Sequence, residues 1–392
     1  MEKPVIRISV RNLVEFILRN GDLESGGTAG DKEAMLKGSR LHRKIQKQMG
    51  SHYQAEVSLK KDTEYEDLIL RVEGRADGIF TQNEKICIDE IKGVYKNLEL
   101  LAEPVLVHRA QALCYAWIYL DDHGLEEIDV QMTYAHLDTE MIKRFRETMT
   151  REELESWYQR LLDSYHKWLS YQMKWREERN RSMEKLEFPF TYRKGQKEMV
   201  AGIYHAISRK EQIFIQAPTG VGKTMSAVFP AVRSIGEGKA ETLFYLTART
   251  ITRTVAQDAF EILRKNGLLF KTVTITAKEK LCFCEKPECN PETCPYAKGH
   301  YDRINDAVYE LWTNEQSFDR ETILRQAEKW QVCPFEMSLE LSVWMDAVIC
   351  DYNYVFDPNV YLKRFFGENI SGKYLFLIDE AHNLVERGRA VS

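Results

Sequence analysis

The sequence lacks the features of several protein classes. It has no uninterrupted apolar stretch long enough to cross a bilayer, so we expect no transmembrane helix and no membrane partner. Its first residues lack the apolar core and the small-residue cleavage site of a secretory signal. It also contains no internal repeat and no low-complexity tract. We therefore expect a protein of the reducing cytoplasm.

A strong excess of one charge is missing as well. The formal net charge is −5 over 392 residues, which argues against a histone-like sheath around DNA. Local basic grooves can still bind nucleic acid on such a protein. The length and a hydrophobic share of 44% are sufficient for two or three domains with real cores.

The eight cysteines include no Cys-x-x-Cys pair, the usual spacing of structural zinc sites. In a reducing compartment they are not expected to form disulfides. Cys87, Cys114 and Cys350 stand singly in apolar surroundings, which indicates buried core thiols. The other five lie between residues 282 and 333. Four thiolates from this group could bind zinc or a [4Fe–4S] cluster, and the spacing alone leaves both open.

Hydrophobic periodicity divides the chain into two parts. Strands are predicted at 55–59, 68–72 and 86–91, with a glycine turn at 74–78 and a helix at 108–120. One or two long helices are predicted from 141 to 185, until Phe188-Pro189-Phe190 breaks the pattern. Beyond it, strands at 212–216, 242–247 and 374–378 alternate with helices, which predicts a parallel α/β sheet.

A phosphate-binding loop follows the predicted strand at 212–216. The segment Ala217-Pro218-Thr219-Gly220-Val221-Gly222-Lys223-Thr224 places glycines before a helix N-terminus, where backbone N–H groups can converge on phosphate oxygens. Lys223 would reach the β- and γ-phosphates of ATP, and Thr224 would hold Mg²⁺. The predicted strand at 374–378 ends in Asp379-Glu380, which would contact Mg²⁺ and activate the attacking water, respectively.

These motifs resemble those of superfamily 2 helicases. The loop and the later Asp379-Glu380-Ala381-His382 box match that family, and Gln196 matches its adenine-contacting glutamine. Leu246–Thr250 resembles the motif that touches the DNA backbone, with Arg249 as the contacting residue. The residues that contact nucleotide are then Gln196, Thr219, Gly220, Gly222, Lys223, Thr224 and Asp379.

The cysteines narrow the resemblance to iron–sulfur helicases of the DinG/XPD type. In that family a cluster subdomain, here about 278–340, is inserted between the phosphate loop and the acidic box. By position, Cys282, Cys289, Cys294 and Cys333 match the [4Fe–4S] ligands, and Cys284 is a spare thiol that could replace a neighbour. The resemblance implies a DNA substrate, single-stranded or 5′-tailed.

A second chemistry is indicated near the N-terminus. One predicted strand segment delivers Asp77, and the next places Glu90 and Lys92 two residues apart, hence on one face. Two carboxylates and an ammonium could bind Mg²⁺ or Mn²⁺ and position a water for phosphodiester attack. Solvated charges on an exposed hairpin are the alternative interpretation.

The order of residues favours the catalytic interpretation, because it resembles RecB-type nucleases of the PD-(D/E)XK superfamily. On that resemblance His42, Asp77 and Glu90 are metal ligands and Lys92 is the catalytic lysine. Gln111 and Tyr115, on the predicted helix at 108–120, would help to hold the DNA strand.

Together these patterns predict an α/β protein of three parts. A PD-(D/E)XK nuclease-like domain (1–140) precedes a helical connector (141–187) and a RecA-like P-loop domain (188–392) with the iron–sulfur insertion. A second RecA-like domain, which supplies arginines for ATP hydrolysis, is absent from the sequence. We therefore expect a truncated chain that hydrolyses ATP weakly alone, and a partner chain could supply that domain.

The expected function is an ATP-dependent DNA helicase with a fused metal-dependent nuclease, acting in DNA repair. Two alternatives remain. The N-terminal module could grip DNA without cutting it, or the chain could be a zinc-stabilised, ATP-dependent switch with no role on DNA.

Overall fold

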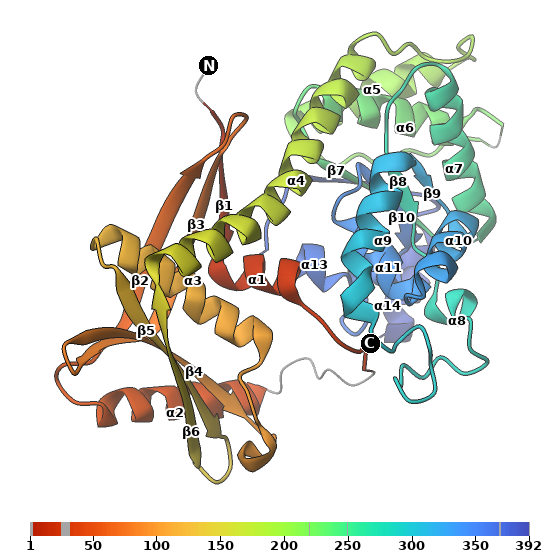
Figure 1. Ribbon diagram of the computed structural model, residues 1–392. Coiled ribbons are helices and arrows are strands. Elements are labelled where there is room, and N and C mark those ends of the chain that lie inside the picture. The colour runs from red at the N-terminus through yellow and green to blue at the C-terminus, as the bar shows by residue number, and fades with distance from the viewer. Residues whose placement is uncertain (1–2, 25–31, 219, 249, 368–369, 392) are drawn as a thin grey trace. The chain divides into compact units, whose positions relative to one another are not determined.

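The computed structural model describes residues 3–24, 32–218, 220–248, 250–367 and 370–391. The chain forms two compact units, Met1–Ser170 and Tyr171–Ser392 (Figure 1). The division falls within the long helix α4, whereas the sequence predicted a separate helical connector between the two globular parts.

A six-stranded mixed sheet is the centre of the first unit. Its order is β1-β3-β4-β5-β6, and β2 pairs with β3. The β1–β3 and β4–β5 pairs are parallel and the others antiparallel. The strands are β1 (Val5–Ser9), β2 (Gln54–Glu64), β3 (Ile69–Gln82), β4 (Lys85–Val94), β5 (Glu127–His136) and β6 (Ile142–Thr150). The helices are α1 (Val10–Leu18), α2 (Lys32–Gln48), the 3₁₀ turn η1 (Leu98–Leu100) and α3 (Leu106–Asp122).

The glycine turn predicted at 74–78 is wrong, because these residues lie inside the long strand β3. Their glycines serve close packing instead of a turn. A Cβ at Gly74 would lie 2.7 Å from the Tyr115 hydroxyl, and one at Gly78 would lie 1.8 Å from the Tyr53 ring. Glycine in a strand interior often marks such a close approach.

The long helix begins at Arg151, not at residue 141. Residues Ile142–Thr150 form β6, whose alternating burial has the two-residue period of a strand. Thr150 then marks the start of α4 (Arg151–Glu184). Its hydroxyl accepts the Glu153 N–H, and the Glu153 carboxylate accepts the Thr150 N–H at 2.9 Å. This reciprocal capping box stabilises a helix start.

The second unit contains a parallel sheet of five strands, as the alternation of strands and helices predicts. Its order is β11-β7-β10-β8-β9, and each pair is parallel. The strands are β7 (Thr242–Thr247), β8 (Thr272–Thr274), β9 (Ser317–Phe318), β10 (Ala347–Asp351) and β11 (Tyr374–Ile378). The helices are α5 (Gln196–Arg209), α6 (Lys223–Gly236), α7 (Thr250–Lys265), α8 (Lys278–Leu281), α9 (His300–Asn314), α10 (Arg320–Trp330), α11 (Pro334–Ser342), α12 (Asn353–Phe356), α13 (Lys363–Phe366) and α14 (Asn383–Val391).

The strand predicted at 212–216 is wrong. In the structure this segment has no strand pairing, and Ile213, Phe214 and Ile215 are exposed. A strand requires a neighbouring strand for its backbone hydrogen bonds, and the described sheet ends at β11. The apolar run indicated the segment's tendency to be extended, but it did not determine a partner.

A buried polar network fixes the C-terminal part of α4 in the second unit. The Asp346 carboxylate accepts hydrogen bonds from the Arg179 guanidinium at 2.6 Å and from the Trp175 indole at 2.9 Å. It also accepts the backbone N–H of Lys271 at 2.7 Å. The groups are buried, so each polar atom needs such a partner.

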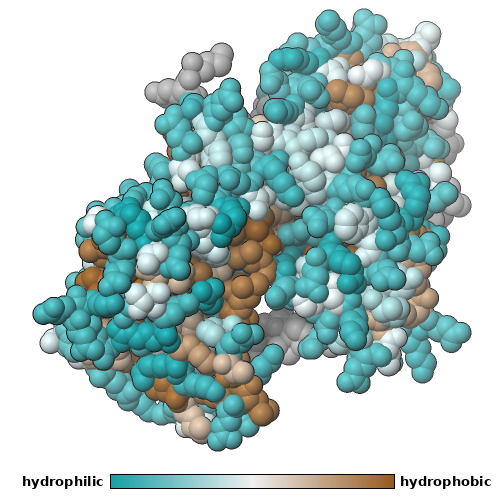
Figure 2. Space-filling model, viewed as in Figure 1, coloured by the Kyte–Doolittle hydropathy of each residue, from teal (hydrophilic) through white to brown (hydrophobic). Residues whose placement is uncertain are grey.

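The described helices include none that is long and apolar enough to cross a membrane. Figure 2 shows mostly hydrophilic side chains on the viewed face, with smaller hydrophobic patches between them. Cys87, Cys114 and Cys350 are fully buried, which confirms the prediction that they are core thiols.

Candidate active sites

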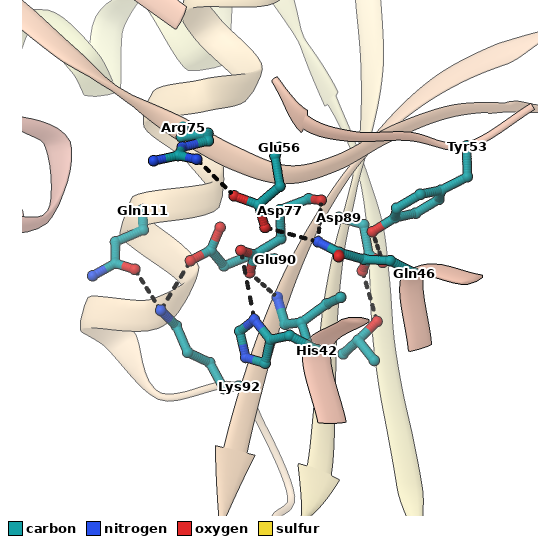
Figure 3. Close-up of polar contacts among 12 residues, drawn as sticks. His42, Gln46, Tyr53, Glu56, Arg75, Asp77, Asp89, Glu90, Lys92 and Gln111 are labelled. Atoms are coloured by element: carbon teal, nitrogen blue, oxygen red, sulfur yellow. Dashed lines mark hydrogen bonds and ion pairs between the residues drawn. The ribbon is translucent and has the colours of Figure 1, made fainter. Parts of the chain in front are cut away.

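Four of the residues predicted near the N-terminus come together beside β3 and β4 (Figure 3). His42 on α2 lies with Nδ1 3.7 Å from an Asp77 carboxylate oxygen. The other Asp77 oxygen accepts the Ile91 N–H at 2.7 Å, in the gap where β3 and β4 separate. Glu90 and Lys92 form an ion pair at 2.9 Å. The structure therefore brings these four side chains together, and their roles as metal ligands and catalytic lysine stay predictions.

Glu90 is the most enclosed acid of this group. Its Oε2 atom is buried and has no hydrogen-bond partner in the described structure. Burial raises the pKa of Glu90 to about 7, although the adjacent Lys92 ammonium opposes that rise. A buried carboxylate oxygen without a donor is costly, and a cation is a natural partner for it.

Gln111 and Tyr115 lie on α3, as predicted, but both side chains are buried within the protein. The Gln111 amide oxygen accepts a hydrogen bond from Lys92 Nζ at 2.7 Å. The Tyr115 hydroxyl is hydrogen-bonded to the backbone of Arg75. Both residues therefore position the site's own side chains and strands, and their predicted contact with DNA stays a prediction.

Two further side chains, those of Gln46 and Glu56, contact this site. The Gln46 amide donates to Glu56 Oε1 at 3.0 Å and to the Asp77 carbonyl at 3.0 Å. Gln46 follows His42 by one helical turn on α2, so the sequence contained a signal for its placement. Glu56 follows no motif, and only the β2–β3 pairing brings it opposite Asp77.

The backbone of Glu56 is strained, with φ of +55°. This left-handed conformation costs a non-glycine residue about 1–3 kcal/mol. The Glu56 carboxylate pairs with Arg75 at 3.4 Å, and both side chains are largely exposed. Such a pair contributes about 0–1 kcal/mol, which does not offset the strain. Strain of this kind concentrates at functional sites.

Asp89, which neighbours Glu90, points to the opposite face of β4. Its carboxylate accepts hydrogen bonds from Thr133 at 2.6 Å, Tyr53 at 2.9 Å and Gln131 at 3.2 Å. Burial raises the pKa of the Asp89 carboxyl. These contacts make Asp89 a structural residue of the sheet.

The phosphate loop has the predicted glycine geometry in the second unit. Gly220 has φ of +85°, and Gly222 has φ of +74° at the N-terminus of α6. The Gln196 amide donates to the Val221 carbonyl at 3.0 Å from beneath the loop. A Cβ on Gly222 would lie 2.8 Å from that amide. Gln196 is thus buried against the loop, and its contact with adenine stays a prediction.

The loop lies next to the acidic pair after β11. The Tyr245 hydroxyl on β7 is hydrogen-bonded to both Thr224 and Asp379, and it therefore links the two predicted Mg²⁺-contacting residues. Lys223 lies 3.7 Å from Glu380. Burial and the neighbouring Glu380 raise the pKa of Asp379. No motif in the sequence marks Tyr245, because it lies in an ordinary apolar strand.

Two predicted residues, Thr219 and Arg249, lie outside the described residues. Their roles in nucleotide and DNA binding stay predictions.

The cysteine-rich segment is irregular from 283 to 299, as expected for a segment with little core of its own. Cys289, Cys294 and Cys333 are buried, while Cys282 and Cys284 are half-buried. Cys284 Sγ lies 3.7 Å from Cys294 Sγ, so the residue predicted to be spare is adjacent to a predicted ligand. Lys278 contacts the Cys289 thiol.

Within the part of the chain that the structure describes, no group of three or more His, Cys, Asp or Glu side chains has the arrangement of a metal site. The donor chemistry is nevertheless suitable at both places. Thiols are the usual ligands of iron–sulfur clusters, and carboxylates with an orphaned oxygen suit Mg²⁺ or Mn²⁺.

Two family models match parts of the second unit. The DEAD/DEAH box helicase family matches residues 193–288, and the DEAD_2 family matches residues 265–391. The C-terminal half of the chain is therefore similar to DEAD/DEAH box helicases and to the DEAD_2 family.

Three known proteins match different shares of this chain. The regulator of telomere elongation helicase 1 homolog of Caenorhabditis briggsae is 23% identical over 52% of this chain and 24% of its own length. The Fanconi anemia group J protein homolog of Gallus gallus is 31% identical over 25% of this chain and 8% of its own length. A solved XPD helicase is 17% identical, covers 51% of this chain and 34% of that chain, and has a TM-score of 0.33. The chain thus spans 24% of the length of the first relative and 8% of the length of the second.

Proposed function

We propose that this chain is an ATP-dependent DNA helicase of the XPD type. The observation that carries this proposal is the Tyr245 hydroxyl between Thr224 and Asp379, which joins the phosphate loop to the acidic box. Lys223 and the N–H groups around Gly220 and Gly222 would neutralise the phosphates, while Asp379 would share their Mg²⁺. Glu380 would orient the attacking water.

Calorimetric titration with ATP and Mg²⁺ tests the nucleotide site directly. Lys223→Ala removes the cation that reaches the phosphates, so we expect nucleotide affinity to fall by about ten-fold or more. Lys239→Ala is a matched control, because Lys239 pairs with Glu237 beyond the far end of α6. Failure of the parent chain to bind ATP would overturn the helicase proposal.

We also propose that the N-terminal unit is a metal-dependent nuclease acting on single-stranded or 5′-tailed DNA. The observation that carries this second function is the buried, unpaired Oε2 atom of Glu90 close to Asp77 and His42. Asp77, Glu90 and His42 would hold Mg²⁺ or Mn²⁺, which supplies Lewis-acid activation of water and of the scissile phosphate when bound. Lys92, oriented by Gln111, would stabilise charge that develops on the phosphate.

Lys92→Ala separates cutting from gripping. With Mn²⁺ and a labelled single-stranded oligonucleotide, we expect this variant to lose cleavage by at least about a hundred-fold while it retains DNA binding. Lys85→Ala, on the same strand but paired with Glu127, is the control. If the parent protein binds DNA without cutting it, the alternative of a DNA-gripping module is correct.

The cysteine segment is proposed to hold a [4Fe–4S] cluster through Cys282, Cys289, Cys294 and Cys333. What supports this is the burial of three of these thiols and the DinG/XPD resemblance. Anaerobic purification should yield a brown protein with broad absorbance at roughly 400 nm and bound iron. A colourless protein containing zinc would favour a zinc-stabilised domain instead. Cys284→Ser with retained absorbance would confirm that Cys284 is the spare thiol.

A further inference from the structure

Arg75 lies at the edge of the N-terminal site and has no role in the proposed metal binding. It precedes Asp77 by two residues on β3, so both side chains leave the strand on the same side. Figure 3 shows its guanidinium beside Glu56, above the carboxylates of Asp77 and Glu90. The Tyr115 hydroxyl fixes the Arg75 backbone from α3.

The pairing of Arg75 leaves its guanidinium largely available. Its ion pair with Glu56 is 3.4 Å long, and the Arg75 side chain is 63% exposed. Arg71 on the same strand behaves differently, because it makes two hydrogen bonds of 2.6 Å to Asp62 and is 24% exposed. The N–H groups of the Arg71 guanidinium are therefore occupied within the protein, whereas those of Arg75 can donate to another anion.

Glu56 holds Arg75 next to the metal-binding strand. Its strained backbone and the Gln46 amide fix the Glu56 carboxylate, and the same amide contacts the Asp77 carbonyl. A planar guanidinium in this position can donate two parallel N–H groups to the two non-bridging oxygens of a phosphodiester. Lys92 already contacts Glu90 and Gln111, and an ammonium cannot supply two such parallel groups.

We propose that Arg75 is a phosphate-binding residue whose ligand is the backbone of a nucleic acid strand, and that Glu56 holds it in place until the strand binds. On binding, the phosphate replaces the Glu56 carboxylate as the partner of the guanidinium. That this phosphate belongs to a strand being cleaved rests on the proposed nuclease function. The contact between Arg75 and the phosphate is measured separately, by strand binding.

The test uses the full chain and four variants, Arg75→Gln, Arg75→Lys, Glu56→Gln and Arg71→Gln. Single-stranded oligonucleotide binding is measured in Ca²⁺ over a range of salt concentrations, and cleavage is measured in Mn²⁺. Loss of one phosphate contact should reduce the slope of log affinity against log salt by about 0.7 for Arg75→Gln. Its kcat/KM should fall by about a hundred-fold, with Mn²⁺ binding unchanged.

The other variants define the roles of the Arg75 guanidinium and of the Glu56 carboxylate. Arg75→Lys should restore the salt slope but only part of kcat/KM, because a lysine supplies charge without two parallel N–H groups. Glu56→Gln should keep the parent slope and bind the strand at least as tightly. Arg71→Gln should match the parent in both assays, and thermal unfolding of each variant checks that it is folded.

The outcomes distinguish the two proposals. An unchanged salt slope and kcat/KM in Arg75→Gln would overturn the phosphate-binding role, and so would an equal loss of Mn²⁺ binding in that variant. A parent protein that never cleaves, but whose slope still depends on Arg75, would overturn the nuclease function and leave the phosphate contact standing. Absence of both effects would overturn both.

Discussion

At the residue scale, the phosphate loop depends on a backbone conformation at Gly222 that only glycine adopts at low cost, and Gly238, beyond the end of α6, has a similar conformation outside the loop. Gly222 and Gly238 share the same φ of +74°, but their surroundings differ. A Cβ on Gly222 meets the Gln196 amide, while one on Gly238 meets nothing within 4 Å. A substitution at Gly238 therefore introduces backbone strain alone, whereas one at Gly222 adds a steric clash at the loop to the same strain.

We expect Gly222→Ala to weaken ATP binding by about ten-fold or more, because strain of about 1–3 kcal/mol and the clash with the Gln196 amide both disfavour the binding conformation. Gly238→Ala should lower the free energy of unfolding by about 1–2 kcal/mol and leave ATP binding unchanged. Calorimetric titration and chemical denaturation measure the two quantities. Equal nucleotide affinities in the two variants would show that the loop conformation does not control binding.

Lys271 is a buried cation whose charge state depends on pH. Its Nζ donates to the Trp312 and Glu315 carbonyls, at 2.5 Å and 2.6 Å, and lies over the Trp175 ring. Burial lowers the pKa of Lys271 to about 8, although Asp346 opposes that shift. Between pH 8 and its ordinary pKa of 10.5, the unfolded chain binds more protons at this position than the folded protein.

The stability penalty of the buried Lys271 is therefore complete below pH 8 and decreases as the pH rises toward 10.5. We expect the free energy of unfolding of the parent, relative to that of Lys271→Met, to rise by on the order of 1–2 kcal/mol between pH 7.5 and 9.5. Urea denaturation of both proteins across this range measures the difference. A difference that stays constant or falls would contradict the assigned direction.

At the scale of elements, one buried carboxylate binds two side chains on the C-terminal part of α4. Asp346 accepts the Arg179 guanidinium, the Trp175 indole and the Lys271 backbone, and replacing it leaves a buried cation without its partner. We expect Asp346→Ala to reduce the free energy of unfolding by about 3–5 kcal/mol. The exposed pair Glu177–Arg181 on the same helix provides the control, since Glu177→Ala should cost less than about 1 kcal/mol. Similar losses in both variants would mean that burial of the network has no energetic consequence.

Strand pairing separated correct from incorrect predictions at this scale. The strand predicted at 374–378 has the same bounds as β11, because a short apolar run there ends in acidic residues. Strand β7 provides its pairing partner. The run at 212–216 looked similar, but no described strand pairs with it. Residues 142–150 were assigned to a helix because charged residues obscured their two-residue alternation.

At the scale of the whole molecule, each proposed ligand should stabilise its own compact unit. A ligand at a hundred times its dissociation constant adds about 2.7 kcal/mol to the unit that binds it. We expect ATP with Mg²⁺ to stabilise Tyr171–Ser392 and Mn²⁺ alone to stabilise Met1–Ser170. Hydrogen exchange followed by mass spectrometry shows in which unit each ligand protects the backbone amides.

Lys223→Ala should abolish the protection by nucleotide and keep that by Mn²⁺, while Asp77→Ala should do the reverse. Loss of both protections in either variant would indicate that the two sites are not independent.

The sequence by itself determined the local chemistry of this protein. Three short-range patterns are converted directly into structure by backbone geometry. They are the glycine spacing, the acidic pair after an apolar run, and Glu90 with Lys92 on one strand. Tertiary structure decided which distant groups complete them. Tyr245 joins the loop to Asp379, and the β2–β3 register brings Glu56 opposite Asp77. Such contacts depend on strand order and on burial, which no local pattern specifies.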